Sequence, residues 1–191
     1  NHKTFVDVNA RYTFENYDNV SNPTLGMTFS ILGGYTVNAR ETKKQFPYAE
    51  STLGFTLKVT NNEKLVLATR VKGKALFNNN YEFYQAATVG GDFDLRGFRN
   101  QRFSGKQSFY HSSDLRFNLG KLKNTIAPVR YGVFGGFDYG RVWIDNDNSE
   151  KWHQSYGGGL WINGINIITG QISVFNSTDG LRVAVGVGFG L

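Results

Sequence analysis

Apolar and polar residues alternate along most of this chain with a period of two, the pattern of a β-strand with one apolar and one polar face. The end of the chain shows it most clearly, because every second residue from Leu181 to Leu191 is large and apolar. Turns rich in Asn, Asp, Pro and Gly separate such stretches. We therefore predict an all-β fold without helices, with nine hairpin-connected strands at residues 4–15, 24–37, 50–60, 64–77, 109–119, 129–143, 152–163, 165–176 and 181–191.

One long segment, from about 78 to 107, lacks this alternation and contains the sequence Gly-Gly-Asp-Phe-Asp-Leu-Arg-Gly-Phe-Arg at 90–99. A connector of this length usually carries function. Glycine reaches backbone conformations that are closed to other residues, and an arginine among apolar neighbours needs a partner if it is buried. We predict a loop that folds inward and places Arg96 in an enclosed polar space. The alternative at this point is a solvated hairpin tip.

The alternation by itself fits a soluble barrel with an apolar interior as well as a membrane barrel with an apolar exterior. Three features favour the membrane barrel. A closed apolar core would not accept unpaired charges, yet the polar faces carry Arg11, Lys58, Arg70, Asp114, Arg116 and Asp138. The strands match the ~9–11 residues needed to cross a bilayer obliquely, and short turns alternate with longer polar loops. We predict an antiparallel transmembrane β-barrel whose polar face lines the lumen.

Length and composition limit the number of domains and the kinds of partner and site that we expect. A chain of 191 residues is expected to be one domain, here 1–191. Its net charge is +6, but Lys43-Lys44 is the only adjacent basic pair, so we expect no nucleic-acid partner. Cysteine is absent, which removes disulfides and thiolate metal sites. We predict no cofactor and no metal.

Three motifs resemble the outer membrane protein 85 superfamily, the bacterial surface antigen family. They are Gly90-Gly91 with Leu95-Arg96-Gly97-Phe98, then Ser113-Asp114-Leu115-Arg116-Phe117, then Gly136-Phe137-Asp138-Tyr139-Gly140-Arg141-Val142-Trp143. In addition, Asn22-Pro23-Thr24-Leu25-Gly26 resembles the periplasmic turn of that barrel. The resemblance implies that Arg96 enters the lumen and meets Asp138. Further lumen partners are expected at Asp114, Arg116 and Arg130.

The resemblance also implies a sixteen-stranded barrel in the bacterial outer membrane, of which this chain would supply the final nine strands. With the 78–107 loop outside the cell, as in the family, residue 1 would also lie outside, so we expect the C-terminal part of a longer barrel. A complete eight-stranded barrel is the alternative if one strand is overcounted. Expected partners are outer-membrane lipid and lipopolysaccharide, the rest of its own barrel or another barrel protein, and client outer-membrane proteins.

The implied function is assembly or translocation of outer-membrane proteins, with the last strand at a lateral seam. The seam residues are Gly186, Gly188, Phe189, Gly190 and Leu191, although the family prefers an aromatic residue where Leu191 stands. One alternative is an anchor barrel for a patatin-like phospholipase or metallophosphatase domain. Another is a small closed barrel of structural or pore type.

Catalytic residues are not expected in this chain. Its three histidines are His2, His111 and His153, and only His153 lies near a potential nucleophile on the same strand face, Ser155. No acid is placed to orient this histidine, and both side chains are expected to face the lumen, away from lipid. A nucleophile–base pair requires a third, orienting group and substrate access.

Overall fold

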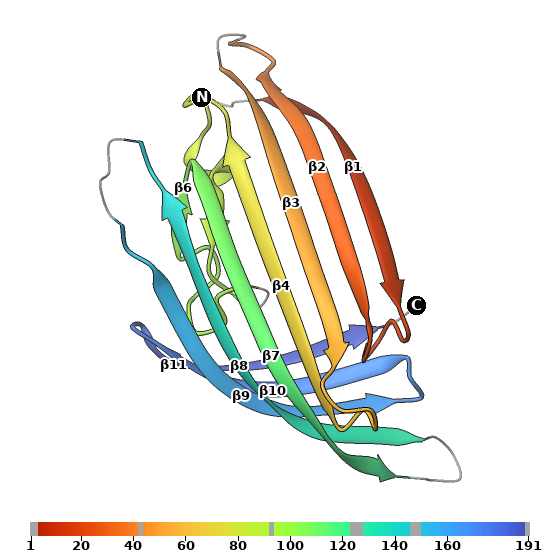
Figure 1. Cartoon of the computed structure of the whole chain (residues 1–191). Coiled ribbons are helices and arrows are strands. Elements are labelled where there is room, and N and C mark those ends of the chain that lie inside the picture. The colour runs from red at the N-terminus through yellow and green to blue at the C-terminus, as the bar shows by residue number, and fades with distance from the viewer. Residues whose placement is uncertain (1–3, 42–43, 92–93, 123–127, 146–149, 190–191) are drawn as a thin grey trace.

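In the computed structural model, which describes residues 4–41, 44–91, 94–122, 128–145 and 150–189, nine antiparallel strands form one sheet in the order β1-β2-β3-β4-β7-β8-β9-β10-β11 (Figure 1). The strands are β1 (Phe5–Tyr17), β2 (Gly26–Asn38), β3 (Gln45–Lys58), β4 (Leu65–Leu76), β7 (Gln107–Leu122), β8 (Val129–Trp143), β9 (His153–Gly164), β10 (Ile168–Ser177) and β11 (Gly180–Phe189). The nine predicted strands are confirmed, and β8 has the predicted bounds. Every neighbouring pair is antiparallel, as hairpin connections require.

The sheet curls without closing. Figure 1 shows β1–β4 as one wall and β9–β11 sweeping across to the other side. Among the described residues β1 pairs only with β2, and β11 pairs only with β10. The sheet therefore has two free edges. The alternative of a closed eight-stranded barrel is wrong for this part of the chain.

Most strand ends differ from the predicted bounds by a few residues, and β10 begins at Ile168 because 165–167 form the turn before it. Two details differ more. Strand β3 begins at Gln45, five residues before the predicted start at residue 50. Pro47 lacks an N–H group, but its carbonyl still accepts a hydrogen bond from Phe77 at 3.0 Å, so pairing extends past it. The long loop is also more ordered than its sequence indicates. It contains the 3-10 helix η1 (Phe83–Gln85) and the short strands β5 (Ala87–Val89) and β6 (Phe103–Gly105).

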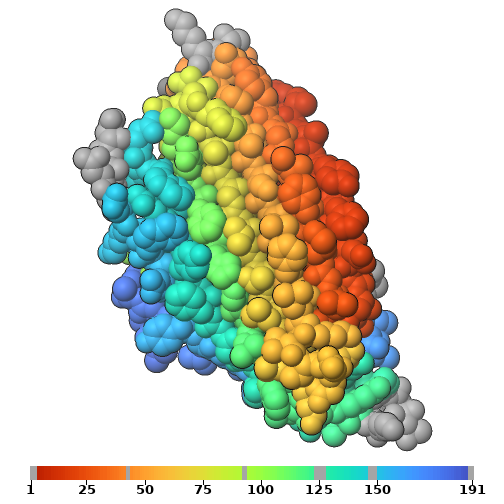
Figure 2. All heavy atoms as spheres, in the orientation of Figure 1, coloured from red at the N-terminus to blue at the C-terminus, as the bar shows by residue number. Residues whose placement is uncertain are grey.

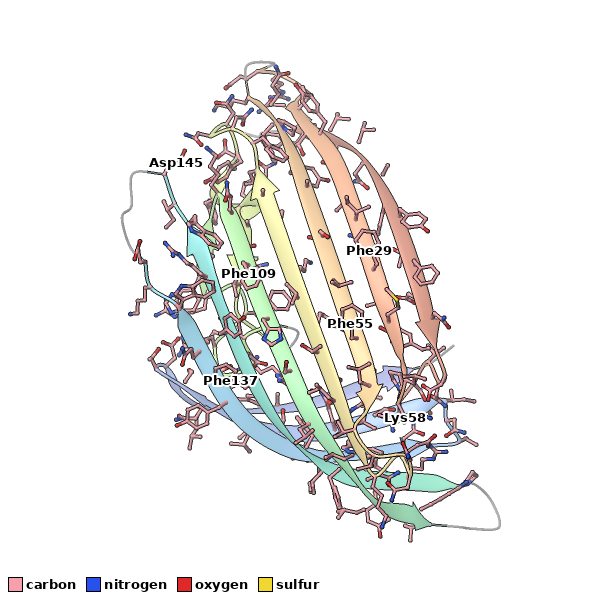
Figure 3. The ribbon with its side chains drawn as sticks, in the orientation of Figure 1. Phe29, Phe55, Lys58, Phe109, Phe137 and Asp145 are labelled. Atoms are coloured by element: carbon pink, nitrogen blue, oxygen red, sulfur yellow. The ribbon has the colours of Figure 1, made fainter. Side chains whose placement is uncertain are left out.

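Amphipathicity is inverted relative to that of a water-soluble protein. Large apolar side chains face outward, such as Val8 at 71% and Val185 at 75% exposure, whereas Asp138 and Ser155 are both 0% exposed on the inner side. Figure 3 shows outward phenylalanines along the wall, and Figure 2 shows its packed outer surface. Such a surface is stable only in contact with lipid. The described residues include no helix long and apolar enough to span a membrane.

Candidate functional site: the arginine loop and the lumen

The loop between β4 and β7 is anchored inside the curled sheet by its own small apolar core. Strand β5 pairs with β6, which brings both ends of the loop together. The backbone N–H of Lys106 donates to the carbonyl of Trp143 at 2.8 Å and so fixes the loop to the end of β8. The apolar core comprises Val89, Leu95, Phe98 and Tyr110, with Phe103 and Val142 packed against it. Leu95 and Phe98 are 0% exposed, so burial of these two side chains holds the intervening residues in the lumen.

Three glycines let the loop reach this position. Gly90 and Gly91 have φ angles of +123° and +132°, which are strained for any residue with a side chain. Gly97 is required for a different reason, since a β-carbon there would lie 2.7 Å from the β-carbon of Ser155. The loop therefore approaches β9 more closely than any other residue type would allow.

Arg96 sits at the centre of an ion-pair network. Its Nη2 donates to Oδ1 of Asp138 at 2.6 Å, and its Nε donates to Oδ2 of the same carboxylate at 3.0 Å, which is a bidentate arrangement. Its backbone N–H adds a third bond to Oδ2 at 3.0 Å. On the other side, Nη1 lies 2.7 Å from Oδ1 of Asp114. The guanidinium also lies 4.1 Å from the centroid of the Phe175 ring.

Asp138 is held from both neighbouring strands. Ser112 of β7 and Ser155 of β9 donate to its carboxylate at 2.8 and 2.9 Å. These two serines lie on the lumen face at the register positions opposite Asp138. The carboxylate is thus fully hydrogen-bonded although it is completely buried, as a buried charge must be.

The loop is tied to the last two strands as well. The hydroxyl of Ser177 donates to the carbonyl of Gly97 at 2.7 Å, and Nη1 of Arg182 donates to the carbonyl of Arg96 at 3.3 Å. The loop therefore contacts β7, β8, β9, β10 and β11 through a single short segment. This bracing can hold the free-edge strand β11 in the curvature of the sheet.

A second segment, the β1–β2 turn, folds into the lumen from the opposite end. Nη1 of Arg116 donates to Oδ1 of Asn22 at 2.7 Å, and Nη2 of Arg116 donates to the carbonyl of Pro23. Across the lumen, Asn163 and Thr169 hydrogen-bond to Ser21 at 3.0 and 2.7 Å. The turn thus links β7 to β9 and β10.

Asp18 organises this turn internally. Its carboxylate accepts hydrogen bonds from the backbone N–H groups of Thr24 and Leu25 at 2.8 and 3.1 Å and from the Thr24 hydroxyl. Burial alone would raise its pKa, but these bonds and the nearby Lys58 ammonium outweigh burial, and the net effect lowers the pKa of Asp18. The role of this turn in filling the lumen was not predicted. The Asn22-Pro23-Thr24-Leu25-Gly26 motif indicates a turn here but not that the turn lies in the lumen.

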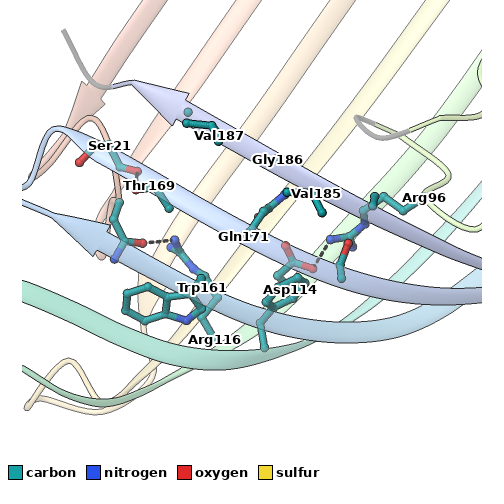
Figure 4. Close-up of a pocket in the computed structure, with 15 residues that line it drawn as sticks. Ser21, Arg96, Asp114, Arg116, Trp161, Thr169, Gln171, Val185, Gly186 and Val187 are labelled. Carbon is teal, nitrogen blue, oxygen red and sulfur yellow. Dashed lines mark hydrogen bonds and ion pairs between the residues drawn. The ribbon is translucent and has the colours of Figure 1, made fainter.

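Between the arginine loop and the turn lies a cavity of about 370 Å³ (Figure 4). Its walls include both ion-pair residues Arg96 and Asp114, the aromatic side chains of Phe134 and Trp161, and the inner side of β11 from Ala184 to Gly188. Gln171 of β10 covers Gly186, where an added β-carbon would lie 3.3 Å from its Cγ. Charged and apolar side chains both line the cavity, which reaches the free-edge strand.

Of the remaining predicted residues, some lie away from the Arg96 pair and some fall outside the described residues. Arg130 faces the lumen but lies roughly 26 Å from Asp138 along β8 at ~3.3 Å per residue, so the structure does not bring it to the Arg96 pair. It lines a small pocket beside Arg116 and Trp161. In the seam, Gly186 and Gly188 lie in β11 and Phe189 ends it, while Gly190 and Leu191 fall outside the described residues. His153 stacks on Phe103 with ring centroids 3.5 Å apart, and Ser155 bonds to Asp138.

An antiparallel sheet with apolar residues outside, polar residues inside and an inward arginine loop defines a transmembrane β-barrel of the outer-membrane type. The Omp85 superfamily domain matches residues 1–191, and the chain belongs to that superfamily. Membership places the chain in the bacterial outer membrane.

A solved structure shares this fold: the crystal structure of BamA from Haemophilus ducreyi lacking POTRA domains 1-3. The TM-score is 0.72 at 16% sequence identity, over 95% of this chain. The chain spans 42% of that BamA chain. No curated protein matches the sequence.

Proposed function

We propose that this chain contributes part of an outer-membrane barrel that assembles or translocates other outer-membrane proteins, with the arginine loop bracing the lumen and β11 forming one side of a lateral seam. The proposal rests on the difference between the two hydrogen-bonding edges of β11. One side is paired with β10 along its length and bound to the loop through Arg182, whereas the other side is unpaired among the described residues. A braced but unpaired edge is suited to receive another strand.

In this proposal residues 1–191 are one barrel domain, with the loop at about 78–107 as its internal brace. The partners are the remaining strands of its own barrel or those of another barrel protein, the lipid and lipopolysaccharide around it, and client outer-membrane proteins. The barrel acts by strand pairing and without catalytic chemistry of its own. Gly186 and Gly188 weaken strand order near the seam, because glycine loses more conformational freedom on folding than other residues.

Photocrosslinking in the full-length protein tests this function. A photoreactive amino acid replaces Val187 on the free-edge strand, and a matched variant carries it at Leu160 in the interior strand β9. The two side chains are similarly exposed on the outer wall, at 64% and 57%. We expect crosslinks to a client strand arrested during insertion from position 187 and none from position 160.

Equal crosslinking at both positions, or none at either, would contradict a seam at β11. If the full-length protein releases fatty acid or phosphate and does not insert other outer-membrane proteins, the result favours the anchor-barrel alternative.

A further inference from the structure

Four glycines on the lumen face of the sheet each lie beneath a ring from the neighbouring strand. Gly26 pairs with Tyr17, and a β-carbon added at this glycine would lie 2.6 Å from Cδ1 of the tyrosine ring. The arrangement recurs at Gly34 beneath Tyr48, Gly132 beneath Trp161 and Gly157 beneath Phe175. In each case the ring belongs to the residue paired with the glycine, so it occupies the space that a side chain on the glycine would need.

These glycines let a large side chain lie flat against the backbone of the next strand. Glycine inside a strand often marks such a close approach, and aromatic rings stabilise strand glycines that lack packing of their own. One of the rings extends over a second strand as well, since Cζ of Phe175 lies 2.9 Å from a β-carbon added at Gly136 of β8. A lumen-facing glycine in this sheet can therefore be the place where a ring from the adjacent strand packs.

Gly188 of β11 lies on the same face but has no ring above it. The even-numbered residues of β11 face the lumen, because Nη1 of Arg182 donates to the carbonyl of Arg96 there. On the β10 side Gly188 pairs with Thr169. Apart from its chain neighbours, the nearest described atom to an added β-carbon is the carbonyl oxygen of Thr169, at 4.0 Å. On the other side lies the free edge of the sheet, so Gly188 is open within the described part of the chain.

Neither the backbone nor the described neighbours require glycine at position 188. The described glycines with left-handed φ angles are Gly26, Gly90, Gly91 and Gly180. Gly188 is not among them, and the space above it would admit a side chain. Because glycine weakens a strand, its use at this position is best explained by a side chain that approaches from beyond the free edge.

The cavity beside Gly188 offers room for an aromatic ring and polar groups for the tip of that ring. It has a volume of about 370 Å³, and its walls include Phe134 and Trp161 (Figure 4). Pockets of ~300–1,000 Å³ enclose whole small molecules, so one ring fits. Nε1 of Trp161 is buried and has no hydrogen-bond partner among the described residues, so the wall holds a donor that an oxygen atom of an occupant could use.

Tyr48 shows where the tip of such a ring points. Its ring starts on β3 and lies over Gly34 of β2, and its hydroxyl donates to Oδ1 of Asp7 on β1 at 3.0 Å. In the same arrangement, a ring that starts on a strand beyond β11 and lies over Gly188 would bring its tip to β10. Gln171 of β10 lines the cavity there, and its amide can both donate to and accept from a hydroxyl.

We propose that Gly188 and the cavity beside it form a site for one tyrosine side chain, carried by a client strand that pairs with the free edge of β11. The tyrosine faces the lumen opposite Gly188, its ring packs on the glycine, and its hydroxyl bonds to Gln171. Phenylalanine would fill the same space but leave the polar wall without a partner, so it binds less tightly. The inference rests on the proposed function, because it names the side chain that the seam selects.

The test measures how synthetic strands bind to the full-length protein in detergent. A photoreactive amino acid replaces Val187, and labelled peptides of about ten residues alternate valine with threonine. Three versions of the peptide carry tyrosine, phenylalanine or alanine at one central threonine position. The peptide concentration that gives half-maximal crosslinking is read for each version. We expect tyrosine to lower this concentration at least tenfold relative to alanine, with phenylalanine in between, because burial of an aromatic ring contributes at least this factor.

Gly188→Val fills the site from within β11 and should make the tyrosine and alanine peptides bind alike. Gly33→Val is the matched control and should keep the tenfold preference. A β-carbon added at Gly33 also lies in open space, with nothing within 4 Å, but this residue faces outward from β2. Equal crosslinking by the tyrosine and alanine peptides when residue 188 is glycine, or a preference that survives Gly188→Val, would overturn the tyrosine site and leave the seam in place. Absence of crosslinks with every peptide would contradict both.

Discussion

At the scale of single residues, the lumen network shows how a charge is accommodated inside the barrel. The sequence around Arg96 predicts an inward loop because an arginine lies among apolar and glycine residues. Its pairing with Asp138 was expected only through the family resemblance. The two serines that complete the carboxylate shell were not predicted, because Ser112 and Ser155 meet Asp138 through strand register, and register is set by the whole sheet.

The first prediction concerns this ion pair. Arg96→Ala and Asp138→Ala should each destabilise the barrel by about 3–5 kcal/mol, because each leaves a buried charge without its partner. The double variant should cost less than the sum of the two. Both losses of stability are measured by denaturation, in which the folded fraction is read from the difference in gel mobility between the folded and the heat-unfolded forms.

Arg102→Ala is the matched control for that experiment. Its Nε lies 2.7 Å from Oδ2 of Asp179, so it also ties the loop to the β10–β11 turn, but its side chain is 48% exposed. A surface pair of this kind contributes about 0–1 kcal/mol. Equal losses of stability in Arg96→Ala and Arg102→Ala would show that enclosing the Arg96 pair in the lumen does not add to its contribution to stability.

The second prediction is a pH dependence in the β1–β2 turn. The pKa of Asp18 is lowered in the folded state, so the folded protein holds this proton less tightly than the unfolded chain. Its contribution to stability is therefore present above the ordinary carboxyl pKa of 3.8 and is lost as the pH falls through the lower folded value. Asp18→Asn should remove this part of the acid dependence, as measured by denaturation between pH 6 and about pH 3. Asp179→Asn provides a carboxylate control at the opposite end, and an unchanged acid limb in Asp18→Asn would contradict the assignment.

At the scale of elements, period-two patterning predicts the nine long strands because each has one face in lipid and one in the lumen. The pattern does not predict strand ends. Strand β3 extends back to Gln45 because its backbone pairs with β2 beyond the point where side chains alternate. Nor does the pattern predict β5 and β6, since their pairing depends on the apolar core formed by Leu95 and Phe98 within the lumen.

The third prediction tests the inverted faces on one strand. Spin labels at Val183, Val185 and Val187 should be accessible to lipid-soluble oxygen and protected from a polar relaxing agent, whereas a label at Ala184 should show the reverse. Val185→Arg should cost about 2–4 kcal/mol at mid-membrane depth. Protection of Ala184 together with polar access at the three valines would mean that the apolar face is not in lipid.

At the scale of the whole molecule, the structure is an open wall. An odd number of antiparallel strands gives β1 and β11 the same direction, so these two edges cannot join as antiparallel neighbours. Two segments of this chain nevertheless bond to strands across the inside of the curl, the arginine loop at one end and the β1–β2 turn at the other. Both braces join residues that are far apart in sequence, which is why local patterning could not predict them.

The last prediction concerns closure. Each free edge presents a row of unpaired backbone groups, and each such group costs several kcal/mol in hydrocarbon. Residues 1–191 produced alone should therefore associate edge to edge or fail to insert, whereas the same residues joined to further strands of one barrel should form a stable monomer. The measurement is the native mass in detergent compared with the denatured chain mass of 21.4 kDa. A monodisperse, protease-resistant monomer of 21.4 kDa would mean that the two edges meet after all. One of the nine strands would then have to leave the sheet, since only an even number can close with every neighbour antiparallel.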